Sequence, residues 1–274
     1  MVGQGVLREC LLDPGVERVV TLGRNPTGQR HEKLHELTRP DLPFFVAQLP
    51  KVQSWAELRD ERALEILAQI DSQFAFIAAV TGLNVSRYKW TMEWLAVMLQ
   101  FTIEVELMFK HVFACYRPVD LSPQIQPIIS TPGHGSYPMG HAAQAFATIV
   151  ALTGLLKIAP GDPAYVQLYR QARRFSVNRV VAGVHFPIDA AAGQMLGTTL
   201  GEFFLWMNNI KTVKCMERTF APSGFGSDAA NDFLGDAPLG PPTGGLEVGP
   251  VVLTTYSKYL EKMKDLARDE WDLK

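Results

Sequence analysis

Two cations on one apolar stretch are the first residues of this sequence that could do chemistry. Lys110 and Arg117 are seven residues apart in a predicted helix that ends at Pro118. Seven residues make two helical turns, so both side chains lie on the same face. The surrounding segment is strongly apolar and has little polar surface to which a solvated charged face could belong. Two cations on an apolar helix require an anion, and the pair therefore predicts an anion-binding site.

A helix N-terminus is the second candidate element. Pro138 can occupy the first helical turn, and Gly140 allows the backbone to come close to a ligand. Free N–H groups at such a helix start point toward a bound oxyanion. His141 lies within this first turn, although a single histidine in this position is more often structural.

A third element combines a base with a carboxylate. His185 and Asp189 are four residues apart across a helix start marked by Pro187. The carboxylate can accept a hydrogen bond from one ring nitrogen and leave the other free as a nucleophile or ligand. Arg179, six residues before His185, adds a permanent positive charge.

In this order, the motifs Lys-x6-Arg-Pro, Pro-x-Gly-His and Arg-x5-His-x3-Asp resemble the signature of one superfamily. It contains the vanadium-dependent haloperoxidases, the type 2 phosphatidic-acid phosphatases and the bacterial acid phosphatases. The resemblance covers roughly residues 105–200, and the loop over 121–138 looks like those of small bacterial haloperoxidase-like proteins. It implies an all-α fold, a helical bundle whose helix ends converge on a phosphate-shaped anion.

The resemblance also implies a role for each matching residue. The equatorial oxygens of the anion are held by Lys110, Arg117 and Arg179, with the Gly140 amide as a further donor. His185 bonds the vanadium or phosphorus, Asp189 orients His185, and His141 is the acid–base on the apical side.

Two chemistries fit this pocket, because vanadate and the phosphoryl transition state share a trigonal-bipyramidal shape. The sequence shows no signal peptide and no membrane span, which favours a cytoplasmic haloperoxidase over the secreted or membrane phosphatases. His134 is seven residues before His141, where vanadium bromoperoxidases carry an extra histidine. We therefore expect a vanadate cofactor, with bromide or iodide, hydrogen peroxide and a small organic acceptor as substrates.

Other functions stay open. The first alternative is a soluble acid phosphatase that forms a phosphohistidine, and the second is a degenerate member that binds an oxyanion without turnover. A zinc hydrolase is suggested by "HEKLH" over 31–35, but charged neighbours and the irregular segment around it argue against that function. A net charge of −2 with both signs interspersed predicts neither a nucleic-acid partner nor a membrane partner.

Two positions depart from the family pattern. Met139 stands where the motif has serine, and a thioether cannot donate a hydrogen bond to an equatorial oxygen. The loss of such a donor is worth about 1.5–3 kcal/mol, so we expect weaker vanadate binding. Leu107 stands where several haloperoxidases have tryptophan, which argues against chloride oxidation.

The chain divides by composition into four parts. We predict an irregular N-terminal arm over 1–52, the helical catalytic domain over 53–215, a Gly/Pro-rich connector over 216–250 and a C-terminal helix over 251–274. No strand pattern of useful length is present. Three distant cysteines without CxxC spacing predict free thiols. The short chain suggests a homodimer or a higher homo-oligomer that completes the site.

Overall fold

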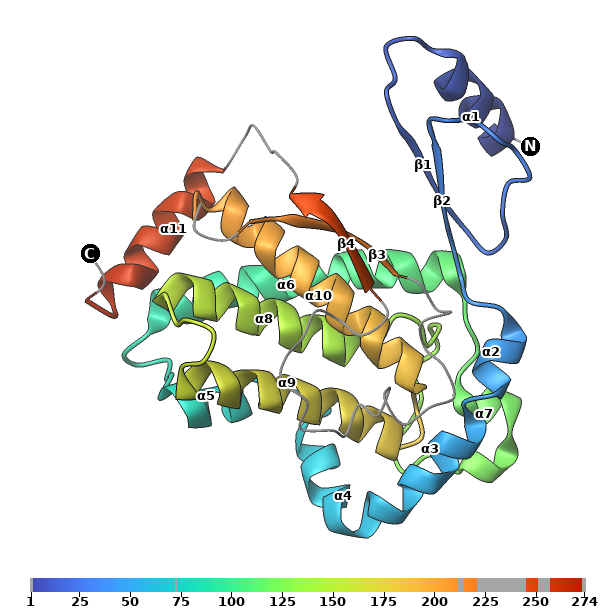
Figure 1. Cartoon of the computed structure of the whole chain (residues 1–274). Coiled ribbons are helices and arrows are strands. Elements are labelled where there is room, and N and C mark those ends of the chain that lie inside the picture. The colour runs from blue at the N-terminus through green and yellow to red at the C-terminus, as the bar shows by residue number, and fades with distance from the viewer. Residues whose placement is uncertain (1, 72, 211–213, 221–244, 251–256, 273–274) are drawn as a thin grey trace.

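A computed structural model describes residues 2–71, 73–210, 214–220, 245–250 and 257–272. Its body is a bundle of long helices, as Figure 1 shows. The helices are α4 (Arg59–Ala68), α5 (Phe74–Thr81), α6 (Lys89–Phe113), α8 (Gly140–Leu156), α9 (Pro163–Val181), α10 (Pro187–Met207) and α11 (Lys258–Asp269). The predicted all-α class is confirmed. Among the described residues, no helix combines the length and the apolar character needed to cross a membrane.

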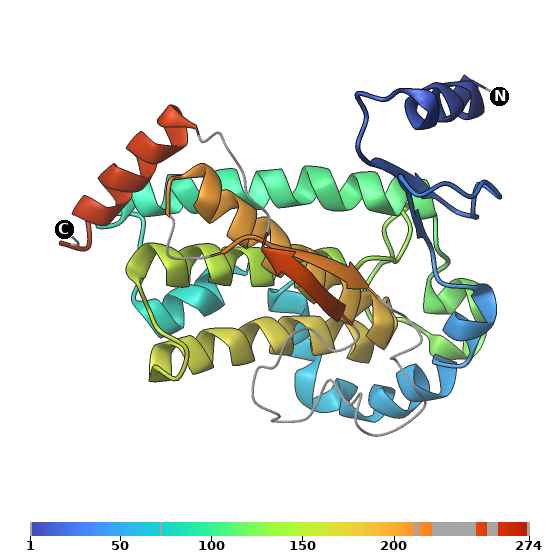
Figure 2. The same ribbon diagram turned by 45° about the horizontal axis from the view of Figure 1, so that its top comes forward.

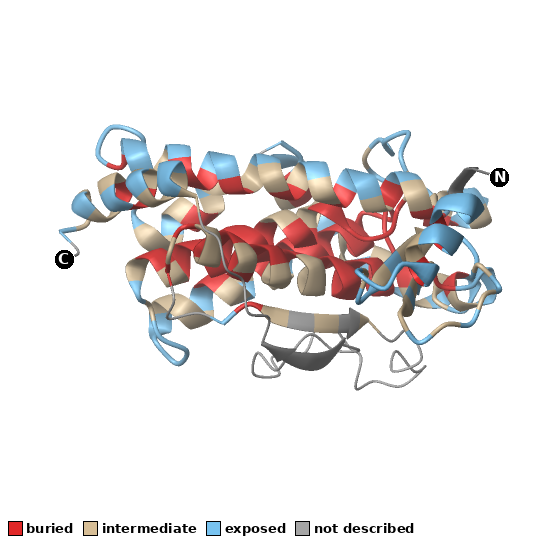
Figure 3. Cartoon of the chain, turned by 90° about the horizontal axis from the view of Figure 1, so that it is seen from above, coloured by how far each residue is buried: buried red, intermediate tan, exposed pale blue. Residues whose placement is uncertain are grey.

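Helix α8 is the centre of the bundle, because its sequence is apolar on every face. It packs against α10, α6 and α9, and Figure 3 shows the buried residues concentrated along this axis. The core has two parts. One includes Phe146, Leu152 and Trp94, and the other surrounds Phe45, Phe186 and Met139 near the start of α8.

Glycines allow α8 and α10 to come into backbone contact. A Cβ atom on Gly197 would overlap the backbone of Ala143, and one on Gly193 would overlap the carbonyl of Met139. On the other side of the contact, Gly154 faces Leu205. Because this packing leaves no room for a side chain, it fixes how the two helix starts sit relative to one another.

The helix predicted to end at Pro118 is found, with a shifted limit. Before it, α4 and α5 are separate helices, because the chain turns between the end of α4 and the start of α5. The helix that contains Lys110 is α6, which ends before Pro118 and does not include Arg117, because Ala114 adopts a left-handed conformation with φ of 44°. Its N-terminus is capped from a distance, since the Glu270 carboxylate accepts hydrogen bonds from the amides of Trp90 and Thr91.

The N-terminal stretch is more regular than predicted. It contains α1 (Val2–Leu12), strands β1 (Val19–Gly23) and β2 (Leu34–Thr38), α2 (Leu42–Val46) and the beginning of α3 (Leu49–Trp55). The two strands are parallel and only five residues long, too short for a visible alternation. Figure 2 shows α1 and these strands projecting from the bundle.

The segment predicted as a connector also contains strands. β3 (Met216–Phe220) pairs antiparallel with β4 (Gly245–Pro250), and the rest of the predicted connector lies outside the described residues. The expectation that the chain has no strands was therefore wrong for four short segments. The proposed division at residues 53 and 215 stays a prediction. The expected free thiols are present at Cys10, Cys115 and Cys215.

The Gly197→Ala variant tests the contact between α8 and α10. Since the added Cβ would overlap the backbone of Ala143, the helices must separate, and we expect the free energy of unfolding to fall by about 1–3 kcal/mol. Gly5→Ala is the matched control, because it lies in α1 with nothing near the new methyl group. Urea denaturation measures both, and equal stability of the two variants would contradict the close contact.

Candidate oxyanion site

Three cations are buried at one end of the bundle. Lys110 lies in the last turn of α6, Arg117 directly precedes the short helix α7 (Pro118–Leu121), and Arg179 lies in the last turn of α9. Their exposed fractions are 1%, 3% and 1%. Charged side chains are almost never buried to this extent without a partner.

The hydrogen-bond partners of these cations are mainly neutral carbonyl groups. Lys110 Nζ donates to the carbonyls of Gly135 (3.3 Å) and Ser136 (3.1 Å). Arg117 donates to the Val184 carbonyl at 2.7 Å. Arg179 Nη2 donates to the Ile66 carbonyl at 2.7 Å.

No carboxylate compensates this charge directly. In the described part of the chain, none of the three cations forms an ion pair with Asp or Glu, and the buried Arg179 Nε has no hydrogen-bond partner. Burial lowers the pKa of Arg179 to about 10, still well above neutral pH. Burial also lowers the pKa of Lys110, to about 8, while the nearby Glu106 carboxyl group acts in the opposite direction. At neutral pH the cluster is therefore positively charged and suits a multivalent oxyanion.

His185 and Asp189 form the predicted pair at the start of α10. His185 Nδ1–H donates to Asp189 Oδ2 at 3.0 Å, and the same oxygen accepts the Phe186 amide at 2.9 Å. These two hydrogen bonds to Asp189 Oδ2 fix the orientation of the ring. The other ring nitrogen, Nε2, is then directed toward Arg117, whose Nη1 lies 3.5 Å away.

Electrostatics keep the His185 ring neutral. Burial, followed by the charges of Arg117 and Lys110, holds its pKa well below the ordinary value. His141 and Arg179 act on the same ring in the same direction. Four basic residues from separate parts of the sequence are thus close enough to influence the His185 ring. The ring has an unprotonated Nε2 at neutral pH.

The start of α8 differs from a serine-capped helix. Met139 has the extended backbone of an N-cap residue, but its side chain makes no capping hydrogen bond and is fully buried. Its amide donates to the carbonyl of Asp189 at 2.9 Å, which ties the start of α8 to the start of α10. Gly140 follows as the first helical residue.

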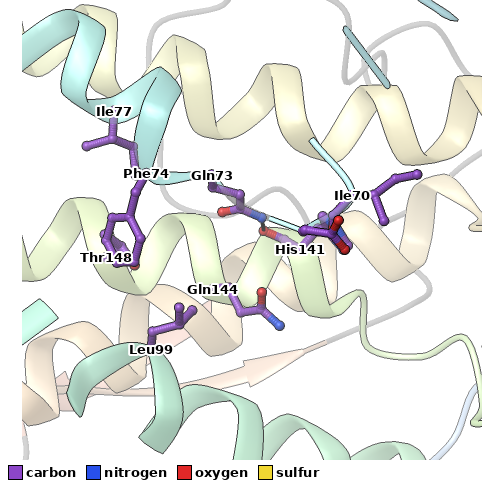
Figure 4. Close-up of a pocket in the computed structure, with 9 residues that line it drawn as sticks. Ile70, Gln73, Phe74, Ile77, Leu99, His141, Gln144 and Thr148 are labelled. Atoms are coloured by element: carbon purple, nitrogen blue, oxygen red, sulfur yellow. Dashed lines mark hydrogen bonds between the residues drawn. The ribbon is translucent and has the colours of Figure 1, made fainter. Parts of the chain in front are cut away.

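His141 is turned away from the position implied for an apical acid. Its Nε2 lies 3.1 Å from the Gln69 carbonyl and 3.2 Å from that of Ile70, so this nitrogen carries the proton and donates. Burial and the nearby Arg179 charge lower its pKa to about 4. Figure 4 shows the ring at the edge of a cavity of about 50 Å³, together with Gln144 and Phe74.

His134 lies at the rim of the cluster. Its Nδ1 is 3.4 Å from Arg117 Nη2, and burial lowers its pKa. The loop that carries it also supplies the carbonyls that bind Lys110 and Arg117. The structure thus brings all the predicted site residues to one end of the bundle, with His141 oriented differently from the expectation.

Several contributors escaped the sequence analysis. The end of α4 supports the site through backbone carbonyls, namely Ile66 for Arg179 and Gln69 for His141. Main-chain groups carry no residue-type signal, so no motif could reveal them. Glu106 is also buried here, and its position one turn before Lys110 in an apolar helix was a signal that could have been used.

The zinc motif has no support in the structure. His35 lies in strand β2, so His31 and His35 do not share a helical face. Among the described residues, no group of three or more His, Cys, Asp or Glu side chains could hold a metal ion.

Comparison with known proteins gives a match over the middle of the chain. Residues 92–212, which contain Lys110, Arg117, Arg179 and His185, match the model of the PAP2 superfamily. This part of the chain is thus similar to that superfamily.

One curated relative is an undecaprenyl-diphosphatase from Sulfolobus acidocaldarius. It is 26% identical to this chain over 128 residues, which are 45% of the chain and 59% of the relative. The chain thus matches less than two thirds of that relative. The relative is named as a phosphatase and not as a haloperoxidase.

Replacing Met139 separates helix capping from core packing. Met139→Ala removes a fully buried side chain and should lower the free energy of unfolding by about 2–5 kcal/mol. Met139→Ser leaves a similar void but places a hydroxyl on an extended N-cap residue, so it should be more stable than Met139→Ala by about 1 kcal/mol. Thermal or urea denaturation of both variants measures the difference, and no advantage of serine would show that the hydroxyl does not cap α8.

Proposed function

We propose that this protein is a PAP2-type phosphatase that cleaves a phosphate ester or diphosphate through a phosphohistidine on His185. The observation that supports it is the neutral His185 ring, held by Asp189 and surrounded by buried cations without carboxylate partners. The family match and the name of the archaeal relative support the same reaction class.

Each step uses residues of the described cluster. The phosphoryl oxygens bind to Lys110, Arg117 and Arg179, which stabilise the charge that spreads over them in the transition state. The lone pair of His185 Nε2 forms a bond to phosphorus while the bond from phosphorus to the leaving oxygen breaks. Water then attacks the phosphohistidine, which releases inorganic phosphate and restores the imidazole.

Protonation of the leaving oxygen is assigned to His141. A bound phosphate dianion offsets the Arg179 and Lys110 charges that lower the pKa of this histidine. The ring must also release the Gln69 and Ile70 carbonyls to reach the leaving group. Burial raises the pKa of Asp189 to about 7, while the Phe186 amide and the charges of Lys110 and Arg117 act in the opposite direction. In its ionised form Asp189 stabilises the charge that develops on His185.

The size of the cavity beside His141 restricts where the organic part of the substrate can lie. The relative is named for undecaprenyl diphosphate, but the cavity beside His141 has a volume of only about 50 Å³. That volume holds a few water molecules and not a polyprenyl chain. We therefore propose a phosphate or diphosphate whose organic part lies outside this cavity.

A vanadate-dependent haloperoxidase is the second candidate, and the position of His134 favours it. Its Nδ1 lies 3.4 Å from Arg117 Nη2, at the edge of the cationic cluster. The buried cations and the unpartnered Arg179 Nε fit vanadate, with His185 Nε2 as its ligand, whereas Met139 offers no hydroxyl. Bound vanadate would supply the activation of hydrogen peroxide for bromide or iodide oxidation, and the protein residues would hold its oxygens.

His185→Ala is the decisive variant. We expect it to lose hydrolysis of p-nitrophenyl phosphate by at least about 10³-fold, because the nucleophile is removed while the binding cations remain. His111→Ala, an exposed histidine on α6, is the matched control and should keep full activity.

Two further measurements distinguish the candidates. Rapid quenching with a ³²P-labelled substrate should trap an acid-labile, base-stable phosphoprotein in the wild type and not in His185→Ala. Iodide oxidation that requires both orthovanadate and peroxide, without any phosphate release, would reject the phosphatase in favour of the second candidate.

A further inference from the structure

Glu106 is a buried carboxyl group that the proposed mechanism does not use. It lies one helical turn before Lys110 on α6 and is 4% exposed. Its carboxyl group packs directly against Gly140, the first residue of α8, and any Cβ atom at position 140 would overlap it. A side chain at position 140 would therefore displace the Glu106 carboxyl group.

The two oxygens of this carboxyl group have different surroundings. Oε1 accepts a hydrogen bond from the Gln144 amide at 3.0 Å. Oε2 is buried and has no hydrogen-bond partner among the described residues. An unpaired buried carboxylate oxygen is costly, and its presence beside a helix N-terminus indicates that something binds there.

An ionised Glu106 would oppose the proposed substrate. The carboxyl group lies between the start of α8 and Lys110, so its negative charge would repel an incoming phosphoryl dianion. Burial raises the pKa of Glu106 to about 7, while Lys110 and the Gln144 amide act in the opposite direction. Protonation near neutral pH is therefore accessible.

The other charged groups on the neighbouring helices are engaged elsewhere. On α10, Asp189 faces His185 and Glu202 is paired with Arg218. On α8, His141 faces the end of α4. Helix α11 packs on the distant start of α6, and near β1 the Arg24 side chain donates to the Val112 carbonyl.

We propose that Glu106 binds the phosphoryl oxyanion as a neutral carboxylic acid, with its Oε2–H donating to an oxygen of the anion. The carboxyl group would replace the serine hydroxyl that Met139 lacks in the family motif. This inference rests on the proposed oxyanion site. It adds a binding residue that the three motifs do not contain.

The proposal predicts how anion binding changes with pH. When Glu106 is ionised in the free protein, anion binding takes up one proton from solvent, and the carboxyl O–H bond forms without any other covalent change. Binding is then strongest below about pH 7 and weakens above it, by up to about tenfold per pH unit from this group alone.

Tungstate at micromolar concentration is the probe, because at that dilution it does not condense to polytungstates and stays a tetrahedral dianion over the pH range in question. Calorimetry from about pH 6 to 9, in buffers of different ionisation enthalpy, gives both the affinity and the number of protons taken up. Glu106→Gln retains a donor but cannot ionise, so its proton uptake should fall by up to one. Glu104→Gln is the matched control, since Glu104 is exposed on the same helix.

A second variant separates charge from hydrogen bonding. Glu106→Leu removes both, and at about pH 6 we expect it to bind tungstate about tenfold to a hundredfold more weakly than Glu106→Gln. In infrared difference spectra, tungstate should increase a protonated carboxyl band in wild type and Glu104→Gln but not in Glu106→Gln.

The outcomes are distinguishable. Tungstate binding with equal proton uptake in wild type and Glu106→Gln would overturn the role of Glu106 and leave the oxyanion site standing. Equal affinity of Glu106→Gln and Glu106→Leu at acidic pH would also reject the hydrogen bond. Failure of wild type to bind tungstate at any pH would reject the proposed function, and the role of Glu106 with it.

Discussion

Buried positive charge without direct carboxylate partners is the constraint on which the site depends. Lys110, Arg117 and Arg179 are held by backbone carbonyls, which orient the cations without neutralising them. A buried ion pair would satisfy each cation and remove its affinity for a ligand. Carbonyl groups instead supply hydrogen bonds and leave the net charge for a multivalent anion. The free energy cost of burying these charges is thus offset only when the oxyanion is bound.

Helix packing places the remaining groups around that charge. The glycine contact between α8 and α10 brings the Met139 amide onto the Asp189 carbonyl. The start of α8, with Gly140, therefore lies beside the start of α10, with His185. The same two helices form the centre of the core, so the geometry of the site is set by the most rigid part of the bundle. The end of α4 completes it by binding Arg179 and His141.

Met139, which departs from the family motif, and Glu106 meet at the start of α8. Met139 removes a hydroxyl donor and fills the core, while Glu106 places a carboxyl group against the same helix start. A neutral acid restores the donor, but it also makes binding depend on proton concentration. The position of Glu106 matters for both candidate functions. An ionised carboxyl group there would repel vanadate as strongly as phosphate. Charge in the pocket, more than its shape, therefore decides which anions it accepts.

The sequence by itself determined the helical class and the residues of the cationic cluster, because helical periodicity and the spacing of side chains are local properties. His185 and Asp189, across a helix start, are such a local pair. The prediction that Lys110 and Arg117 share a helical face was wrong, because α6 ends at Phe113 and Arg117 lies in the extended segment before α7. The short strands β1 to β4 were not predictable, since strands of five or six residues show no alternation and depend on distant partners. Only the tertiary structure decided the orientation of His141 toward α4 and the contact of Glu106 with Gly140. Both contacts depend on which helices pack against one another, and this packing involves segments that are far apart in the chain.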